Sequence, residues 1–426
     1  MKTFLNHSKS KTIIVVSNWE NTEKWAPFYQ AFEENEYNVK ILCFSNSDIK
    51  SALVTGRYFI DFRKINYSQS SAVNTHNIGW DDIYSLRRVG GAPNRDEIQV
   101  FKKKVNQIIL EHNPVIFFGE KTWPHELFIN LIAKKSGIKY LSPICVRIPD
   151  KYFYLSSELE LPEFSEGSLS ELEVSDGINQ LIQRKPPKYS RTQMNGIPRK
   201  ERLISYIHSI RSLQAEAYSR PNVWHRIKSG CQKYVNNWAA HRIPIVANSK
   251  FCYFVHVQPE ASIDILGNGL RSNQTIFDWV SYSIGQGKIE IPKTEPILSV
   301  KFHSSFRGRW ETINLSHLNL PQIVQPSNEI LDRGIIPITV SGTIAIEALV
   351  AGIRPIVLGS PFFKNAPGII TVNSCQELSD AMSYSDYKWQ SVDSTIEYMQ
   401  STYKKCFNIN QLESISKYVK KIKGFS

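Results

Sequence analysis

The segment 338–358 constrains the fold more than any other part of the chain. It consists of an apolar run, a turn of small residues at 341–343, a short helical stretch with a single carboxylate, and a second apolar run at 355–358. Gly352 and Pro355 separate the helical stretch from the second run, because glycine commonly ends a helix and proline cannot continue one. A buried strand in this position is typical of a parallel α/β layer. The segment therefore predicts an α/β fold.

The turn at the centre of this segment predicts a phosphate site. Ser341, Gly342 and Thr343 are small enough for a ligand to approach the backbone. The hydroxyl groups of Ser341 and Thr343 lie where a helix presents N–H groups that lack a partner within the helix. Glu347 follows about one turn later, in reach of sugar hydroxyls beside that phosphate. Phosphate and sugar together indicate a nucleotide. An ordinary βαβ turn capped by serine or threonine has the same spacing and is the alternative.

The chain is long enough, at 426 residues, for two domains. Apolar runs at 11–17, 38–44 and 114–120 alternate with helical patterns, and the same alternation returns from about residue 250. We predict an N-terminal Rossmann-like lobe over 1–183, a basic helical bridge or insertion over 184–246, a C-terminal nucleotide-sugar-binding lobe over 247–385 and C-terminal helices over 386–426. In such sheets the loops at the carboxyl ends of the strands carry the site.

The net charge of +12 indicates an acidic partner. Basic residues are concentrated over 184–228, where they form either a solvated surface or a face that rests on anionic lipid, next to a lipid-linked acceptor. Nucleic acid is disfavoured because no recognition motif accompanies the charge. No apolar run reaches the roughly eighteen residues of a membrane span, and the N-terminus lacks the apolar core of a secretory signal. We expect a cytoplasmic protein, with peripheral contact to the inner membrane through the basic segment.

The cysteines argue against a metal or disulfide framework. They are scattered singly, without the close pairs that zinc sites use, and are expected to be reduced thiols.

Three loops of the second lobe carry polar residues directly after predicted strands. They hold Gln258 and Glu260, then Lys301 and His303, and finally the turn at 341–343 with Glu347. In a parallel sheet these loops share one edge, where a lysine, a histidine and a helix start can hold a phosphate or diphosphate. Each motif alone is weak, since a single histidine is more often structural than a ligand. Their joint occurrence in this order favours a nucleotide site.

With these motifs the chain resembles the capsule polysaccharide biosynthesis proteins, which include bacterial transferases that add Kdo to lipid anchors. The resemblance is carried by residues 256–262 (HVQPEAS), by the Lys-x-His of 301–303, and by SGTxxxEALxxG from 341 to 352, followed by PIVLGSPFF at 355–363. It covers roughly 250–365. It implies a GT-B glycosyltransferase: two Rossmann-like lobes, with the donor nucleotide in the C-terminal one. Many relatives use CMP-activated acidic sugars.

Two further motifs bear on the resemblance. The family commonly has His-Pro after the lysine, whereas this chain has His303 followed by Ser304, so that the loop loses the rigidity of a proline. In the first lobe, residues 118–120 (FGE) and 123–126 (WPHE) also look like a motif of such enzymes.

Glycosyl transfer needs a stabilised leaving group and a carboxylate that either takes the acceptor proton or attacks the anomeric carbon. Lys301, His303 and the 341–343 turn are predicted to supply the first, in place of a divalent metal, because no Asp-x-Asp pair occurs in a suitable loop. Glu120, at a strand end, is the predicted catalytic carboxylate, and His125 and Glu126 beside it are predicted to belong to the same catalytic group. The alternative is that Glu120 caps the following helix. No cofactor or metal is expected beyond the nucleotide-sugar substrate.

The predicted function is therefore a glycosyltransferase of capsule or lipopolysaccharide synthesis that transfers a sugar, for example Kdo from CMP-Kdo, to a glycan or lipid-linked acceptor. UDP- or GDP-sugar donors suit the same turn. A sugar-nucleotide epimerase shares the architecture and needs no acceptor. The alternative that is not an enzyme is a non-catalytic component of a polysaccharide assembly. The donor base and sugar, the acceptor, the anomeric outcome and the oligomeric state are left open by the sequence.

Overall fold

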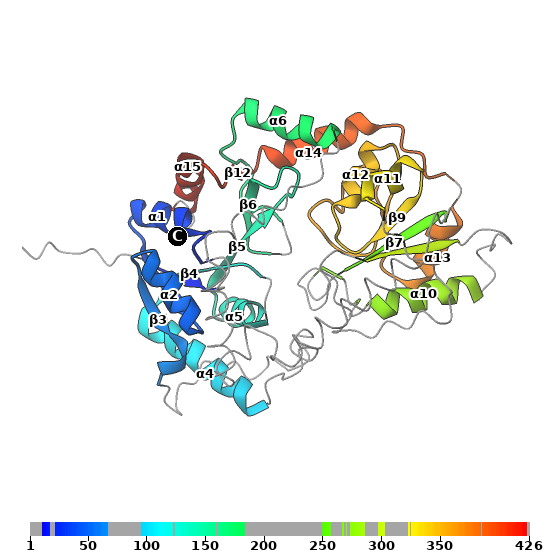
Figure 1. Ribbon diagram of the computed structural model, residues 1–426. Helices are drawn as coiled ribbons and strands as arrows, with labels where there is room; N and C mark the ends of the chain where they lie inside the picture. Colours follow the sequence, from blue (N-terminus) through cyan, green and yellow to red (C-terminus); the bar gives the residue numbers. More distant parts are fainter. Residues whose placement is uncertain are drawn as a thin grey trace, which may run out of the picture.

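A computed structural model describes residues 11–17, 22–66, 95–121, 124–158, 161–183, 249–256, 266–267, 270, 273–285, 297–302, 323, 325–384 and 386–423. These residues form two α/β lobes, each built around its own sheet (Figure 1). The predicted α/β fold with two lobes is confirmed. The predicted basic insertion of 184–246 lies outside the described residues, as do Gln258, Glu260 and His303.

The sheet of the first lobe is parallel except at one edge. Its strands are β1 (Thr12–Val16), β2 (Asn38–Cys43), β3 (Tyr58–Asp61), β4 (Pro114–Phe118), β5 (Lys139–Cys145), β6 (Tyr152–Ser156) and β12 (Phe407–Asn408), in the order β12-β6-β5-β4-β1-β2-β3. The pairs from β3 to β5 are parallel, whereas β6 and β12 are antiparallel additions. The order β3-β2-β1-β4-β5 is that of a Rossmann sheet, and the chain reverses direction across the sheet between β1 and β4.

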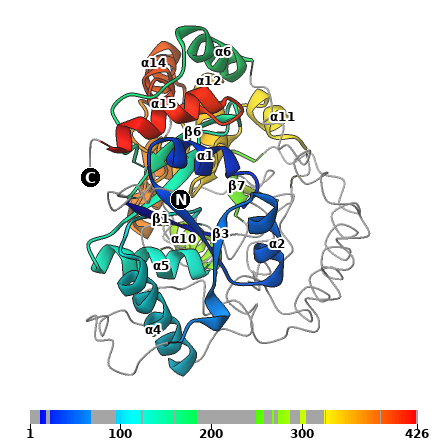
Figure 2. The same ribbon diagram turned by 90° about the vertical axis from the view of Figure 1, so that its left-hand side faces the viewer.

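Helices cover both faces of this sheet. They are α1 (Ala26–Glu34), α2 (Asn46–Val54), α4 (Arg95–His112), α5 (Pro124–Lys135) and α6 (Glu171–Ile182), with a 3₁₀ turn at Phe62–Lys64. Strand β1 shows how the faces divide, since Ile13 and Val15 join the core under α1, while Ile14 and Val16 join the core under α4 and α5. Figure 2 shows α1 on one side of the sheet and α4 and α5 on the other. This alternation on a fully buried strand is why β1 is a continuous apolar run.

The sheet of the second lobe is parallel throughout. Its strands β7 (Phe251–Val255), β8 (Leu298–Phe302), β9 (Ile336–Thr339), β10 (Ile356–Val357) and β11 (Ile370–Thr371) lie in the order β11-β10-β9-β7-β8. The helices of this lobe are α10 (Asn273–Gly285), α11 (Ser327–Asp332), α12 (Ile344–Val350) and α13 (Cys375–Ser383). This is the second common doubly wound order, in which the chain passes from β7 outward to β8 and then returns past β7 to β9.

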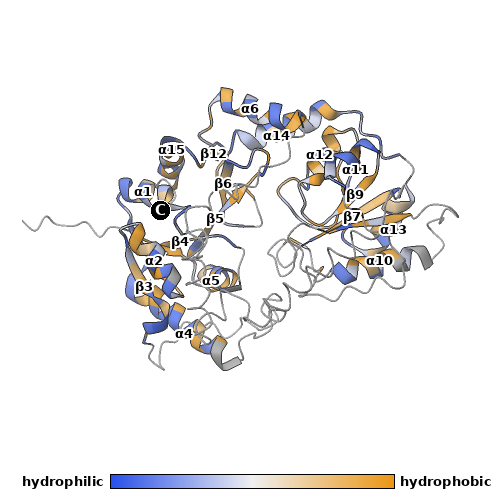
Figure 3. Cartoon of the chain, viewed as in Figure 1, coloured by the Kyte–Doolittle hydropathy of each residue, from blue (hydrophilic) through white to orange (hydrophobic). Residues whose placement is uncertain are grey.

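The C-terminal segment returns to the first lobe. Helix α14 (Val392–Tyr403) contacts both α6 and α12 and so joins the two lobes, and α15 (Leu412–Lys423) packs on α1. The hydropathy colouring in Figure 3 shows apolar and polar residues interspersed along outer helices such as α6 and α14. Residues 386–426 were predicted to be helical, but β12 lies between these helices and pairs with β6. A two-residue strand has no period that a sequence pattern can show.

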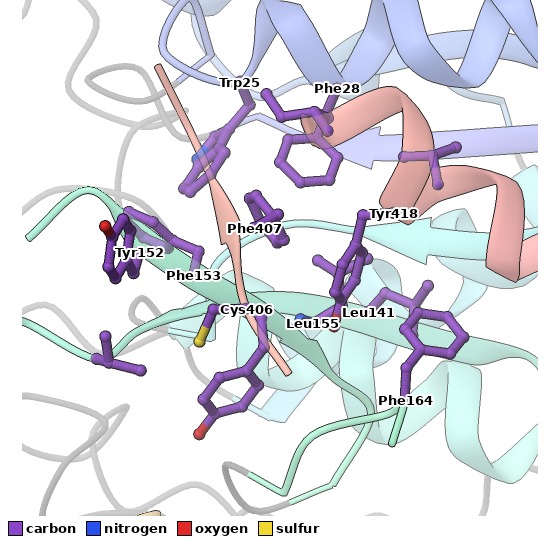
Figure 4. Close-up of a cluster of buried hydrophobic side chains, with 14 of the residues drawn as sticks. Trp25, Phe28, Leu141, Tyr152, Phe153, Leu155, Phe164, Cys406, Phe407 and Tyr418 are labelled. Carbon is purple, nitrogen blue, oxygen red and sulfur yellow. Dashed lines mark hydrogen bonds between the residues drawn. The ribbon is translucent and has the colours of Figure 1, made fainter. Parts of the chain in front are cut away.

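Aromatic packing secures this return of the chain. Figure 4 shows Phe407 of β12 between the rings of Phe28 and Tyr418, with centroid distances of 5.0 and 4.7 Å. Tyr418 also satisfies a buried backbone donor, since its hydroxyl accepts the Leu155 N–H at 3.1 Å. The C-terminal segment is thus an integral part of the first lobe's core.

Candidate functional site

The candidate donor site lies where the carboxyl ends of β7 and β9 meet. His256 follows β7 directly, and its Nε2 atom lies 3.0 Å from Oγ1 of Thr339, the last residue of β9. The same Nε2 accepts the N–H groups of Val340 at 3.1 Å and Ser341 at 3.5 Å. Because a backbone N–H can only donate, Nε2 carries no proton in this arrangement. The Thr339 hydroxyl therefore donates to Nε2 and, with its other lone pair, accepts the Gly342 N–H at 3.0 Å.

Asn273 fixes the backbone of His256. It is fully buried at the start of α10, where its Oδ1 accepts the Tyr253 hydroxyl at 2.6 Å and the His256 N–H at 3.3 Å. Its Nδ2 donates to the His256 carbonyl at 3.1 Å. A buried amide with all these bonds made is a rigid support, because losing any of them would leave a buried polar group unsatisfied. Neither Asn273 nor Thr339 was singled out from the sequence, and His256 appeared there only within a motif.

The turn at 341–343 is tightly enclosed. Ser341, Thr343 and Glu347 are each at most 9% exposed, and α12 begins directly after Thr343. A Cβ on Gly342 would lie 2.7 Å from Thr339 Oγ1, so only glycine fits at this position. The predicted small-residue turn before a helix is present. The N–H groups of Gly342, and of Val340 and Ser341 before it, are bonded to side chains of the neighbouring strand ends and are not open to an anion, whereas the predicted contact of an anion with the start of the helix stays a prediction.

Lys301 lies near the carboxyl end of β8, opposite Phe254 of β7. Its Nζ donates to the carbonyl of Gln325. Burial lowers the pKa of Lys301, while the nearby Cys252 and Glu329 act in the opposite direction. The amine is thus anchored to the segment before α11, and its predicted contact with a phosphate stays a prediction.

In the first lobe Glu120 stands at the carboxyl end of β4, next to β1. Its Oε1 accepts the indole N–H of Trp25 at 3.1 Å and lies 3.7 Å from Nζ of Lys24, and its side chain is 17% exposed. Lys24 lies over the Trp25 ring, 4.6 Å from the centroid. An indole donor and an ammonium group on the same oxygen fix the orientation of the Glu120 carboxylate.

His125 and Glu126 occupy the first turn of α5 and are buried, with exposures of 1% and 0%. The His125 Nε2 lies 3.2 Å from the Ser17 carbonyl, and its ring packs 4.7 Å from that of Phe44. The structure therefore places His125 in the interior beneath the end of β1. Burial, and then the charges of Glu126 and Glu120, raise the pKa of the nearby Tyr140 hydroxyl.

Lys121 adds a cation that the sequence did not point to. Its Nζ donates to the Ser157 carbonyl at 2.7 Å and lies 5.8 Å from the centroid of Tyr140. Burial, and then the charge of Lys134, lower the pKa of Lys121 to about 8. Lys24 and Lys121 thus place positive charge at the same strand end as Glu120.

Within the part of the chain that the structure describes, no group of three or more histidine, cysteine or acidic side chains is arranged to hold a metal ion. Among those same residues no helix is long and apolar enough to cross a membrane.

Comparisons with known proteins give distant likenesses. No protein-family model matches the chain, and no curated protein sequence matches it. KpsC of Thermosulfurimonas dismutans, a β Kdo 2,7 transferase, is 12% identical, with 96% of this chain and 99% of that chain aligned at a TM-score of 0.37. A glycosyltransferase from Rickettsia africae is also 12% identical, with coverages of 97% and 98% and a TM-score of 0.31. The UDP-GlcNAc 2-epimerase of Methanocaldococcus jannaschii, in complex with UDP-GlcNAc and UDP, is 13% identical, with coverages of 91% and 98% and a TM-score of 0.28. These TM-scores are too low to carry an argument, so the function must be argued from the chain's own residues.

Proposed function

We propose that this protein is a nucleotide-sugar-dependent glycosyltransferase of bacterial surface polysaccharide synthesis. The observation that carries the proposal is the position of the 339–343 turn, at the point where the order of the second sheet reverses between β7 and β9. In open α/β sheets, ligands bind outside the carboxyl ends of the strands at this switch point. The turn is small, enclosed and held by two neighbouring strand ends, so that the hydroxyls of Ser341 and Thr343, which would contact a phosphate, are carried on a fixed backbone.

In this proposal the second lobe binds the donor. The hydroxyls of Ser341 and Thr343 contact the phosphate, Glu347 accepts hydrogen bonds from sugar hydroxyls, and Lys301 and His303 supply positive charge to the leaving nucleotide. Gln258 and Glu260 complete the donor loops. These groups take the place of a metal ion.

The first lobe supplies the group that acts on the acceptor. The carboxylate of Glu120, oriented by Trp25 and Lys24, takes the proton of an acceptor hydroxyl as that oxygen bonds to the anomeric carbon. The bond from the anomeric carbon to the phosphate oxygen breaks at the same time, and the nucleotide leaves with both electrons of that bond. His125 and Glu126 support this end of the lobe from the interior.

The favoured donor is a CMP-activated acidic sugar such as Kdo, on the basis of the motifs at 256–262, 301–303 and 341–352. The acceptor is a glycan or a lipid-linked glycan, and the basic segment 184–228 is proposed to rest on the anionic inner membrane. A UDP- or GDP-sugar donor fits the same turn. An epimerase would use the same second lobe, but the basic segment 184–228 and the loop that holds Gln258 and Glu260 favour transfer to an acceptor.

Nucleotide binding tests the proposal. CMP, UDP and GDP are titrated against the wild type, against Ser341→Ala, and against Ser383→Ala, an exposed serine on α13 of the same lobe. A ligand that binds only the folded protein raises its melting temperature. We expect CMP to raise the melting temperature of the wild type and of Ser383→Ala, and to raise that of Ser341→Ala by less. Selectivity for UDP or GDP would retain the site and replace the donor, whereas binding of no nucleotide would overturn the proposal.

A further inference from the structure

The end of β7 and the end of β9 are joined by side chains instead of by backbone. Strand pairing between them stops at Tyr253 and Ile338. Beyond that point His256 Nε2 receives the Thr339 hydroxyl and the Val340 and Ser341 N–H groups, and Thr339 Oγ1 receives the Gly342 N–H. The imidazole therefore takes the place of the next ladder partner.

We propose that His256, through Thr339, is a positioning residue that holds the 340–342 turn in the conformation that binds the donor. The inference rests on the proposed function and deepens it, by naming the device that shapes the phosphate-binding turn. The Thr339 hydroxyl and two backbone N–H groups converge on Nε2, and the backbone of His256 is held by Asn273. The arrangement runs from Tyr253 through Asn273 and His256 to Thr339 and ends on the turn.

The polarity of these bonds makes the device specific to a neutral imidazole with a free Nε2. A protonated Nε2 would face two backbone N–H groups and the Thr339 hydroxyl, and the turn would lose its acceptor. Thr339 is fully buried, so its hydroxyl has no solvent to replace a lost partner. If that hydroxyl is removed, the Gly342 N–H loses its acceptor inside the protein, which the turn can relieve only by moving.

Two matched pairs of variants test the inference. Thr339→Val removes the hydroxyl at nearly constant shape, whereas Thr339→Ser retains it. His256→Phe removes the ring acceptor, whereas the amide oxygen of His256→Gln can reach the place of Nε2. Dissociation constants for the nucleotide bound by the wild type are measured by calorimetry, together with kcat and KM for its sugar donor, on variants whose circular dichroism matches the wild type.

We expect Thr339→Val and His256→Phe to raise the dissociation constant and KM about tenfold with little change in kcat, and the serine and glutamine variants to stay within about threefold of the wild type. A purely structural role would lower the melting temperature without this division between KM and kcat. Should Thr339→Val fail to fold, the His256 pair carries the test.

The outcomes separate this inference from the proposed function. If the wild type binds a nucleotide and Thr339→Val binds it equally well, the inference is overturned and the proposed function stands. If His256→Gln binds as poorly as His256→Phe while Thr339→Ser is normal, the ring itself contacts the ligand and the positioning role is wrong. Failure of the wild type to bind any nucleotide would overturn both.

Discussion

The two sheets of this protein each have a switch point, and the two points are built in opposite ways. Between β1 and β4 of the first lobe, the feature at the edge is a side chain, the Glu120 carboxylate, which is oriented by the side chains of Trp25 and Lys24. Between β7 and β9 of the second lobe, the feature is a stretch of backbone at 340–342, which is oriented by His256 and Thr339. A charged side chain suits proton transfer, and a fixed turn that carries the hydroxyls of Ser341 and Thr343 suits recognition of a phosphate. The comparison suggests a division of labour between the lobes.

The largest expected effect is at the first switch point. Glu120→Gln retains the size of the side chain and its ability to accept the Trp25 indole N–H, but removes the base. A positioned general base contributes about 10²–10⁴-fold to the reaction rate, so we expect turnover to fall about 10³-fold. Donor affinity should be unchanged, because the donor is proposed to bind to the other lobe. Steady-state rates and calorimetry on the same preparation measure both quantities.

Glu158→Gln is the matched control, because Glu158 is in the same lobe and its side chain is 62% exposed. Near-normal turnover of Glu120→Gln would remove Glu120 from the reaction. A drop in donor affinity as large as the drop in turnover would contradict the division of labour.

Glycines next to the two switch points provide the second comparison. A Cβ at Gly359 would lie 2.5 Å from the carbonyl oxygen of Val340 and 2.7 Å from that of Leu266, and both are backbone atoms. A Cβ at Gly119 would lie 2.7 Å from the Tyr140 hydroxyl, the far end of a side chain, and 3.2 Å from Val16. We expect Gly359→Ala to lower the free energy of unfolding by about 3 kcal/mol and Gly119→Ala by about 1–2 kcal/mol, because backbone yields less readily than a side chain.

Urea denaturation of the two glycine variants measures these losses. Since Val340 directly precedes the turn at 341–343, Gly359→Ala should also weaken nucleotide binding, whereas Gly119→Ala should leave it unchanged. Equal losses of stability, or unchanged nucleotide affinity in Gly359→Ala, would show that the second turn is less rigid than its packing indicates.

Much of this architecture could be predicted from local pattern. The buried strands β1, β4 and β7 are continuous apolar runs. The helical patterns in the sequence, at about 96–112, 125–136 and 274–284, agree with the bounds of α4, α5 and α10 within a residue or two. The turn at 341–343 was found because small residues between a strand and a helix have a recognisable spacing. The two antiparallel strands β6 and β12 were not found, and β12 belongs to a C-terminal segment that returns to the first lobe.

The supports of the site could not be predicted in the same way. Asn273, His256 and Thr339 are brought together by hydrogen bonds between residues 17 and 83 positions apart. No local period carries that information. Likewise, His125 was predicted to belong to the catalytic group with Glu120, and its ring is directed to the Ser17 carbonyl and packs on Phe44, because the first turn of α5 faces the core.

The smallest expected effect is at Lys121. It tests whether a buried positive charge at the first switch point lowers the stability of the folded protein. Because burial lowers the pKa of Lys121 to about 8, the folded state binds this proton less tightly than the unfolded state, in which an ordinary lysine titrates near 10.4. Below pH 8 the amine is protonated in both states and the cost of burying its charge is fully present. Between about pH 8 and 10.4 the folded protein releases the proton first, and that cost disappears.

We therefore expect Lys121→Met to be about 1–2 kcal/mol more stable than the wild type at pH 7, after the loss of the bond to Ser157, and to lose this advantage by about pH 10. Urea denaturation at the two pH values measures the difference, with the exposed Lys135→Met as control. An advantage independent of pH would mean that the gain comes from apolar packing of methionine, whereas a less stable Lys121→Met at pH 7 would show that the hydrogen bond to Ser157 outweighs the cost of the buried charge.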